Sequence, residues 1–463
     1  MDQGSVKGRI SLEDLSHAIY GVEIDTVLTI FPDMYGRLVG KRVTAAFFLD
    51  QVAEKGVHAC DYLLACDMEM DPVPGYKFTS WETGYGDFHC APDLSTLRIA
   101  SWLPKTAFVL CDLYDDKRHV PVEVAPRRML KRQLELANEM GLKIMAGAEI
   151  ELYLFNETYE SARAKRYHNL QTAGDYVEDY HIFQGTKEES VIGAIRSALE
   201  ESGIPVETSK GEWGPGQQEI NLRFSEALEQ ADRNTIYKHA AKEIAYQQGK
   251  AVTFMAKWDE KQAGSGMHIH LSLWDVEGNA SLCAGDEPMG PLKVSKRFRH
   301  FVGGWIHHAR EITALYAPYV ASYKRFQSGS FAPTSVAWSC DNRTAGFRMV
   351  GSGSSLRVEC RIPGADANPY LVIAASLAAG LDGIRNEIEP PDIFEGDIYQ
   401  AKNLPRVPAS LLEAIREFEQ SAFTKEAFGE DVVEHYLHFF RTEQRKFDEV
   451  VTDWEKIRFF ERV

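Results

Sequence analysis

The sequence predicts an α+β protein with a small N-terminal domain and a larger C-terminal domain. Short β-branched and apolar runs separated by polar turns fill residues 25–115, and prolines mark a boundary near residues 121–126. Helical and strand patterns follow to the C-terminus. A chain of 463 residues is long enough for two or three domains. We therefore expect domains at residues 1–120 and 121–463.

The N-terminal domain is expected to start with a leader helix over residues 1–20. Residues 25–31 predict a strand, residues 32–36 a turn, and residues 37–48 a second extended segment. Residues 60–115 carry further short strands, with Gly84, Gly86 and Asp87 in one of the turns between them.

The larger domain shows clear helix boundaries. Pro126 suits the first position of a helix that stops at Gly141, and Ser225 suits an N-cap. Residues 368–385 are apolar nearly all round, which predicts a buried helix. Residues 387–409 read as a proline-rich connection and residues 410–459 as two or three amphipathic helices. The other expected helices are 188–201, 225–248 and 296–315, and the expected strands are 143–155, 204–208, 252–257 and 267–274.

Composition narrows the class of protein. Hydrophobic content of 44% and charged content of 26% are ordinary for a soluble globular protein. The net charge of −17 argues against nucleic acid or an anionic membrane as a partner. No signal peptide is evident, and the best apolar run, 371–381, is too short to span a bilayer. Seven cysteines without CxxC pairs indicate reduced thiols in a cytoplasmic protein.

Residues 342–370 hold a dense cationic cluster in this acidic chain. Arg343, Arg348, Arg357 and Arg361 lie close together around the single acid Glu359. Such a cluster is expected to meet an anionic partner. Surface arginines paired with local acids are the alternative explanation.

Three predicted strands share one design, in which charged or polar residues alternate with apolar ones. Half-solvated strands often alternate this way, which is the alternative explanation for each strand alone. Together they indicate one core with the polar faces lining one concave site. The polar faces carry Glu149 and Glu151; His268, His270 and Ser272; and Arg357, Glu359 and Arg361.

A turn signal at residues 214–216 is expected to fold back two arms that carry Glu212 and Glu219. Carboxylates brought close together repel unless a cation lies between them. Five glutamates (149, 151, 212, 219 and 359) and His268 suffice for two or three divalent ions, and oxygen-rich ligation favours Mg²⁺ or Mn²⁺. With the arginines, this set suits phosphoryl transfer. The P-loop pattern GxxxxGK[ST] is absent from the sequence.

The sequence resembles the glutamine synthetase superfamily from about residue 24 to the C-terminus. The resemblance is carried by GAEIELYLF, GEWGPGQQEI, GSGMHIHLSL, NRTAGFR and RVECRIPGADANPYL. It implies an N-terminal β-grasp-like domain and a catalytic domain with a curved antiparallel sheet. It also implies that the chain forms a homo-oligomer, namely a double-ring dodecamer with active sites between subunits. It also implies ATP-dependent phosphorylation of the glutamate γ-carboxylate, followed by attack of an amine.

The resemblance also implies roles for individual residues. One metal ion would be held by Glu151, Glu212 and Glu219, and a second by Glu149, His268 and Glu359. ATP would face Glu207, His270, Ser272, Arg348 and Arg357, and Arg343 would contact the γ-phosphate during transfer. Glutamate would be held by Gly264, Arg325 and Arg361, the last also being a catalytic candidate.

The ammonium pocket departs from the glutamine synthetase pattern. Phe331 stands where the flap of those enzymes carries a glutamate, and Ala263 replaces a usual asparagine. Asp61 is the candidate for the amine-deprotonating aspartate, in an unusual context. An aromatic ring can pack against an alkyl or aryl group, so the sequence looks closer to the γ-glutamylamide branch of the family. Packing of Phe331 on its own flap is the alternative.

Three hypotheses follow for the function. The first is a glutamate–amine ligase acting on an alkylamine-type substrate or a polyamine. The second is a glutamine synthetase that uses ammonia at a divergent site. The third is a non-catalytic structural or sensory protein, which the complete set of candidate metal ligands argues against, because buried carboxylates without a function are costly.

Overall fold

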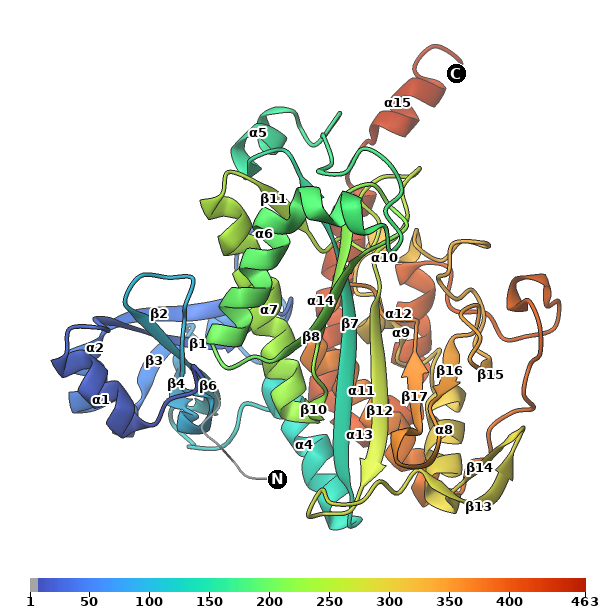
Figure 1. The fold of residues 1–463 in the computed structure, drawn as a ribbon, viewed down its shortest axis with the longest axis horizontal. Coiled ribbons are helices and arrows are strands. Elements are labelled where there is room, and N and C mark those ends of the chain that lie inside the picture. The colour runs from blue at the N-terminus through green and yellow to red at the C-terminus, as the bar shows by residue number, and fades with distance from the viewer. Residues whose placement is uncertain (1–6) are drawn as a thin grey trace.

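The structure, a computed structural model, describes residues 7–463. Its N-terminal part (blue in Figure 1) is built on a six-stranded sheet in the order β2-β1-β6-β4-β3, with β5 paired to β6. Strand β1 pairs antiparallel with β2 and parallel with β6. The strands are β1 (Thr26–Pro32), β2 (Leu38–Thr44), β3 (Val57–Cys60), β4 (Asp87–Pro92), β5 (Arg98–Ile99) and β6 (Thr106–Asp115).

The segment after β2 is helical rather than extended. The expected extended segment 37–48 is wrong beyond Thr44, where short helices begin: α2 (Ala45–Phe47), η1 (Phe48–Val52) and α3 (Ala53–Lys55). Phe48 and Val52, four residues apart, are buried in one cluster with Leu15, a spacing that suits a helix face. Of the leader helix expected over residues 1–20, helix α1 covers Leu12–Tyr20, and residues 1–6 lie outside the described part of the chain.

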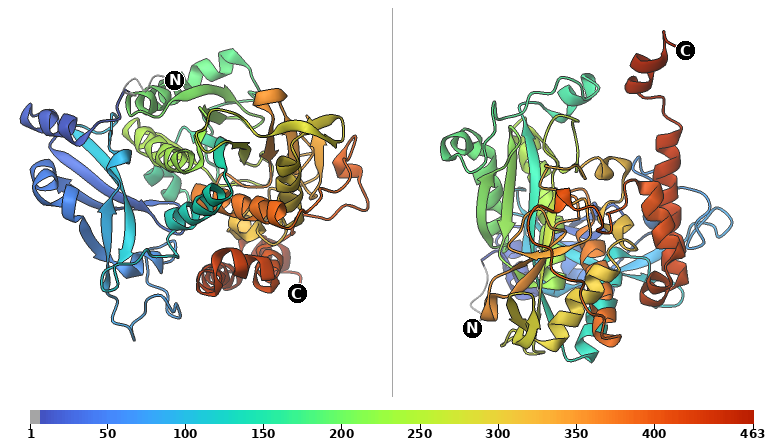
Figure 2. Two further views of the ribbon diagram at one scale, coloured as in Figure 1. Left: turned by 90° about the horizontal axis from the view of Figure 1, so that it is seen from below. Right: turned by 90° about the vertical axis from the view of Figure 1, so that its right-hand side faces the viewer.

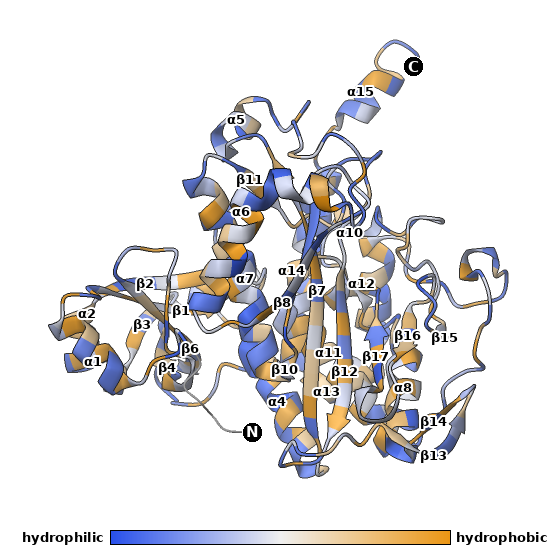
Figure 3. Ribbon diagram, viewed as in Figure 1, coloured by the Kyte–Doolittle hydropathy of each residue, from blue (hydrophilic) through white to orange (hydrophobic). Residues whose placement is uncertain are grey.

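A nine-stranded sheet forms the centre of the larger domain. Seven strands run in the order β15-β16-β17-β12-β7-β9-β8, and the short strands β10 and β11 pair with β7. The pairing of β15 with β16 is parallel, whereas β7, β9, β12 and β17 pair antiparallel with their neighbours. Figure 3 shows apolar and polar residues interleaved along the central strands. The strands are β7 (Lys143–Phe155), β8 (Val206–Gly211), β9 (Gln217–Leu222), β10 (Ser225–Glu226), β11 (Ala251–Thr253), β12 (Met267–Trp274), β15 (Trp338–Cys340), β16 (Phe347–Val350) and β17 (Arg357–Cys360); a separate ribbon pairs β13 (Ala284–Met289) with β14 (Leu292–Val294).

The predicted buried helix is the core of the helical layer. Helix α11 (Pro369–Arg385) is buried over most of its length, and the Asn368 side chain caps it by accepting a hydrogen bond from the Tyr370 amide at 3.1 Å. It packs against α4, α7 and α8. Pro126 occupies the first turn of α4, as predicted. The helices of this layer are α4 (Pro126–Glu139), α7 (Ala227–Gln247), α8 (Lys296–His307), α9 (Thr313–Tyr316) and α10 (Val320–Tyr323).

Three expectations for the larger domain are corrected. Ser225 is not the N-cap of α7, because Ser225 and Glu226 pair with β7 as β10 and the helix starts at Ala227. The strand expected over residues 252–257 ends at Thr253. The C-terminal region forms four helices instead of two or three. Ser421 is the N-cap of the second of these helices and Gly429 is the N-cap of the third, so the helical segment is interrupted at both residues. They are α12 (Leu411–Gln420), α13 (Ala422–Phe428), α14 (Glu430–Asp448) and α15 (Asp453–Phe459).

The views in Figure 2 show the N-terminal sheet beside the larger domain and α15 projecting beyond it. Helices α5 (Tyr159–Ala164) and α6 (Ile182–Glu201) lie at the β8 side of the large sheet (Figure 1). All seven cysteines are free thiols. Among residues 7–463, no helix is long and apolar enough to cross a membrane.

Candidate active site

The register of four neighbouring strands brings the predicted acids and histidines together. Glu149 on β7 stands opposite His268 on β12, and Glu151 on β7 stands opposite Glu219 on β9. His270 on β12 stands opposite Glu359 on β17. Directly opposite residues point to the same face of a sheet. The three polar strand faces therefore form one surface, as the alternation in the sequence predicted.

Glu151, Glu212 and Glu219 form the first carboxylate group. One oxygen from each lies within 4.8 Å of the others, and Glu151 and Glu219 are buried. Burial, and then the neighbouring Glu212 carboxylate, raise the pKa values of Glu151 and Glu219 well above the usual glutamate value. The Glu151 carboxylate also accepts hydrogen bonds from the Gly266 amide at 2.8 Å and the Gln217 side chain at 3.1 Å. A divalent cation among these oxygens would relieve their repulsion.

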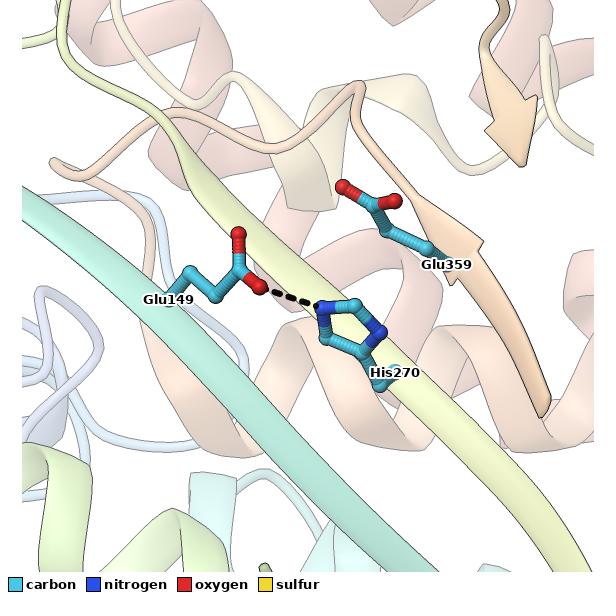
Figure 4. A group of neighbouring side chains, drawn as sticks. All are labelled: Glu149, His270 and Glu359. Carbon is cyan, nitrogen blue, oxygen red and sulfur yellow. Dashed lines mark hydrogen bonds and ion pairs between the residues drawn. The ribbon is translucent and has the colours of Figure 1, made fainter. Parts of the chain in front are cut away.

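Glu149 joins a second group that contains both histidines. Its Oε1 lies 3.1 Å from His270 Nε2 (Figure 4), and its Oε2 lies 3.4 Å from His268 Nδ1. One candidate metal set comprises Glu149, His270 and Glu359, and another comprises Glu149, Glu219 and His268. His268 Nδ1 also lies 3.8 Å from Glu359 Oε1. His268 was the one histidine predicted to bind a metal ion. The structure places His270 equally close to the carboxylates of Glu149 and Glu359.

His268 is suited to metal ligation by its charge state. Burial, and then the nearby Arg361 guanidinium, lower the pKa of His268 to about 4. The imidazole is therefore neutral at physiological pH, which is the form that binds metal ions.

Glu359 is the point where the arginine cluster meets the carboxylates. It is fully buried and accepts hydrogen bonds from Arg348 Nη1 at 2.8 Å and Arg361 Nη1 at 2.5 Å. Burial opposes ionisation, but Arg361 and the two histidines outweigh it and lower the pKa of Glu359. The alternative of surface arginines paired with local acids applies only to the contact of Arg348 with exposed Asp341.

Two cavities open onto this surface. The larger, about 1210 Å³, is lined by Glu151, Glu212 and Glu219 and by two members of the second group, Glu149 and His268. Gly264, Arg343, Arg348 and Arg361 also line it. The smaller, about 460 Å³, is lined by Glu207, His270, Ser272 and Arg357, four of the five residues expected to face ATP. Arg325 lines neither cavity: it is buried beneath them and donates to the carbonyls of Ile362 and Arg361.

The rim of the larger cavity is aromatic. Phe331 and Trp213 are both about half exposed, at 51% and 54%, and their rings meet in an edge-to-face arrangement with centroids 6.2 Å apart. Phe331 has a backbone φ of 58°, in the left-handed region that non-glycine residues rarely adopt. Such strain is typical of functional positions. Phe331 therefore packs against a residue outside its own flap.

Asp61 is remote from this cavity in its own chain. It starts a short turn of helix after β3, and its carboxylate accepts a hydrogen bond from Thr79 at 2.5 Å. No residue that lines the larger cavity within the described part of the chain comes from the N-terminal domain. The structure thus gathers the predicted metal and nucleotide residues but not this candidate base.

Sequence reasoning missed Trp213, Tyr180, Lys210 and Gln217, which also line the larger cavity. Lys210 could have been found, because it lies only two residues before Glu212, a predicted metal ligand. Tyr180 lies in an irregular segment, where the sequence carries no periodic signal.

Comparisons with known proteins agree with this geometry. The family model for the glutamine synthetase catalytic domain matches residues 123–459. The γ-glutamylethanolamide synthetase GlnA4 of Streptomyces coelicolor is 45% identical over 98% of this chain and 96% of its own length. The glutamate–isopropylamine ligase of a Pseudomonas species is 37% identical over 95% of each chain. A solved GmaS/ADP complex is 28% identical and superposes with a TM-score of 0.83, over 96% of this chain and 99% of that one.

Proposed function

The chain belongs to the glutamine synthetase family, and on this premise we propose that it is an ATP-dependent glutamate–amine ligase. It joins the γ-carboxylate of L-glutamate to a substituted amine through γ-glutamyl phosphate, giving a γ-glutamylamide, ADP and phosphate. The observation that carries this proposal is the combination of candidate metal ligands, three arginines and an aromatic pair in the lining of one cavity. The two relatives named above carry the names of γ-glutamylamide-forming enzymes.

The residues of both carboxylate groups fit Mg²⁺ or Mn²⁺. Glu151, Glu212 and Glu219 would hold one ion through oxygen alone. A second ion would be held by Glu149 and Glu359 with His270, or by Glu149 and Glu219 with His268. Burial, and then the neighbouring Glu212 carboxylate, raise the pKa values of Glu151 and Glu219, and a bound cation would stabilise their ionised forms. When bound, such ions bridge phosphate oxygens and neutralise the charge that develops during phosphoryl transfer.

The arginines of the larger cavity act on the reacting anions. Arg343, Arg348 and Arg361 line it, so their guanidinium groups can meet the γ-phosphate and the carboxylates of glutamate. We assign Arg343 to the transferring phosphoryl group, because it has no ion-pair partner among the described residues. Arg325 holds the segment around Arg361 in place by donating hydrogen bonds to two backbone carbonyls. Together with Gly264, it is assigned to the part of the larger cavity that binds glutamate.

The smaller cavity is proposed to take the nucleotide. Glu207, Ser272 and Arg357 line it beside the exposed ring of Phe224. Arg357 donates to His270 Nδ1 at 3.3 Å, which turns the other nitrogen of that ring toward Glu149. His270 therefore links the nucleotide cavity to the second carboxylate group.

The amine is proposed to enter past Phe331 and Trp213. An alkylammonium ion must lose a proton before it can attack an acyl phosphate, so a carboxylate must lie near its path.

Asp61 would serve as this carboxylate only from a neighbouring copy of the chain, because it does not line the cavity of its own chain. We therefore propose a homo-oligomer in which residues 1–120 of one subunit complete the site formed by residues 121–463 of the next, in keeping with the double-ring dodecamer that the family resemblance implies. Free cysteines suit a cytoplasmic location.

A panel of amines tests this function. ATP-dependent phosphate release is measured with glutamate and, in turn, ammonia, ethanolamine, isopropylamine, a straight alkylamine series and a diamine. We expect turnover to be highest with a substituted amine. Ammonia as the best substrate would favour a glutamine synthetase, and no turnover with any amine would favour a non-catalytic protein.

A further inference from the structure

A lysine ammonium is built into the three-glutamate group. Lys210 on β8 stands opposite Glu219 on β9, and Glu219 stands opposite Glu151 on β7. The three side chains therefore form one row across three adjacent strands, on one face of the sheet. Glu212 follows Lys210 by two residues, directly after the end of β8, and its carboxylate forms an ion pair with the Lys210 ammonium.

The contacts of Lys210 tie it to this group. Its ammonium forms an ion pair with Glu212 and lies 3.9 Å from Glu219 Oε1. It also lies over the ring of Tyr180, 4.6 Å from the ring centre. The side chain is 21% exposed, so water screens these contacts only in part.

We propose that Lys210 is the resident counter-ion of the Glu151–Glu212–Glu219 group and sets its affinity for a divalent cation. This inference rests on the proposed metal site. A cationic side chain among three carboxylates offsets part of the repulsion between them. A positive charge beside the site also repels the incoming cation. Lys210 thus holds the metal-free site together and keeps metal binding weaker than three glutamates alone would make it.

The test compares Mn²⁺ binding by the full-length protein and its variants, without nucleotide, through the electron paramagnetic resonance signal of free Mn²⁺. Lys210→Met keeps the apolar stem and removes the charge, and Lys210→Gln is a second neutral variant. Lys210→Arg retains the charge. Lys187→Met is the matched control, because Lys187 also lies over aromatic rings, those of Tyr176 and Phe183, but outside the three-glutamate group.

We expect both neutral variants to bind one Mn²⁺ about tenfold more tightly than the wild type, with Lys210→Arg and Lys187→Met unchanged. The site that binds Mn²⁺ more tightly in these variants should be the site at which Glu212→Gln no longer binds Mn²⁺. In EDTA, the neutral variants should unfold at a lower temperature than the wild type, since nothing then offsets the carboxylate repulsion.

Two results would overturn the inference, and only the second would also overturn the proposed metal site. Equal or weaker Mn²⁺ binding by both neutral variants, beside a wild type that binds normally, overturns the role of Lys210 alone. A wild type that binds no Mn²⁺ overturns the proposed metal site and the role of Lys210 together.

Discussion

Trp213 and Phe331 meet edge to face at the mouth of the active-site cavity, with ring centroids 6.2 Å apart and ring planes inclined by 60°. Trp213 follows Glu212 directly, so one side of this aromatic pair is fixed to the three-glutamate group. The other side lies on the loop between α10 and β15, at a residue with left-handed backbone geometry. The pair offers apolar surface at the point where glutamine synthetases are expected to carry a flap glutamate.

The first prediction concerns amine length. If the aromatic pair binds the amine, kcat/KM should rise by roughly fourfold per added methylene until the pocket is full, because each buried CH₂ contributes about 0.8 kcal/mol. Phe331→Glu should shift preference toward ammonia or polycationic amines, and Phe331→Ala should flatten the length dependence. Phe47→Ala is the control, as Phe47 is similarly exposed at 52% but outside the cavity. An unchanged ranking of amines in both Phe331 variants would refute this role.

The second prediction concerns Glu359. Glu359→Ala should abolish turnover, because it removes a candidate metal ligand. Arg348 and Arg361 would also lose a buried partner. We therefore expect a loss of about 3–5 kcal/mol in the free energy of unfolding. Denaturant unfolding and single-turnover assays measure both effects.

Asp341 provides the matched control for Glu359. It is the other acidic partner of Arg348 but is 77% exposed, so Asp341→Ala should cost at most about 1 kcal/mol. If Asp341→Ala destabilised the protein as much as Glu359→Ala, burial would not be the cause. Near-normal kcat in Glu359→Ala would remove Glu359 from the metal site.

The third prediction separates transfer from nucleotide binding. Arg343→Ala should lower kcat by on the order of 10²-fold or more, because Arg343 lines the larger cavity and is proposed to contact the transferring phosphoryl group. Arg357→Ala should mainly raise the KM for ATP, because Arg357 lines the smaller cavity. Steady-state kinetics with varied ATP distinguish the two. A change confined to the ATP KM in Arg343→Ala would make Arg343 a binding residue instead.

The fourth prediction concerns pH. Glu178 and Glu188 are buried, and the Gln218 amide donates to both, at 2.5 and 2.9 Å. Burial, and then the adjacent Glu178 carboxyl, raise the pKa of Glu188 far above the ordinary 4.5. The folded protein therefore holds a proton that the unfolded chain releases, so this pair lowers stability progressively as the pH rises above about 4.5.

Glu188→Gln mimics the protonated carboxyl and should remove this penalty. The difference in unfolding free energy between Glu188→Gln and wild type should grow between about pH 5 and pH 8. Glu189→Gln is the control, because the adjacent Glu189 is more exposed and pairs with Arg196. A difference that stays constant with pH would show that Glu188 is ionised in the folded protein.

Strand alternation predicted the centre of the site, because directly opposite residues in neighbouring strands share a face. Glu149, Glu151, His268 and Glu359 were found this way. The same periodicity could not place Trp213 against Phe331, since that contact depends on two irregular loops. It also could not show that Ser225 pairs with Ala146 in the sheet, where its preference for an N-cap position is overridden.

The cavity is expected to select a substituted amine over ammonia. The most direct measurement is a competition: the protein with ATP, Mg²⁺ and glutamate receives equimolar ammonia and an alkylamine or ethanolamine, and mass spectrometry gives the ratio of γ-glutamylamide to glutamine. We expect γ-glutamylamide to dominate for at least one small amine, and Phe331→Glu to shift the ratio toward glutamine. Glutamine as the main product against every amine tested would contradict the account.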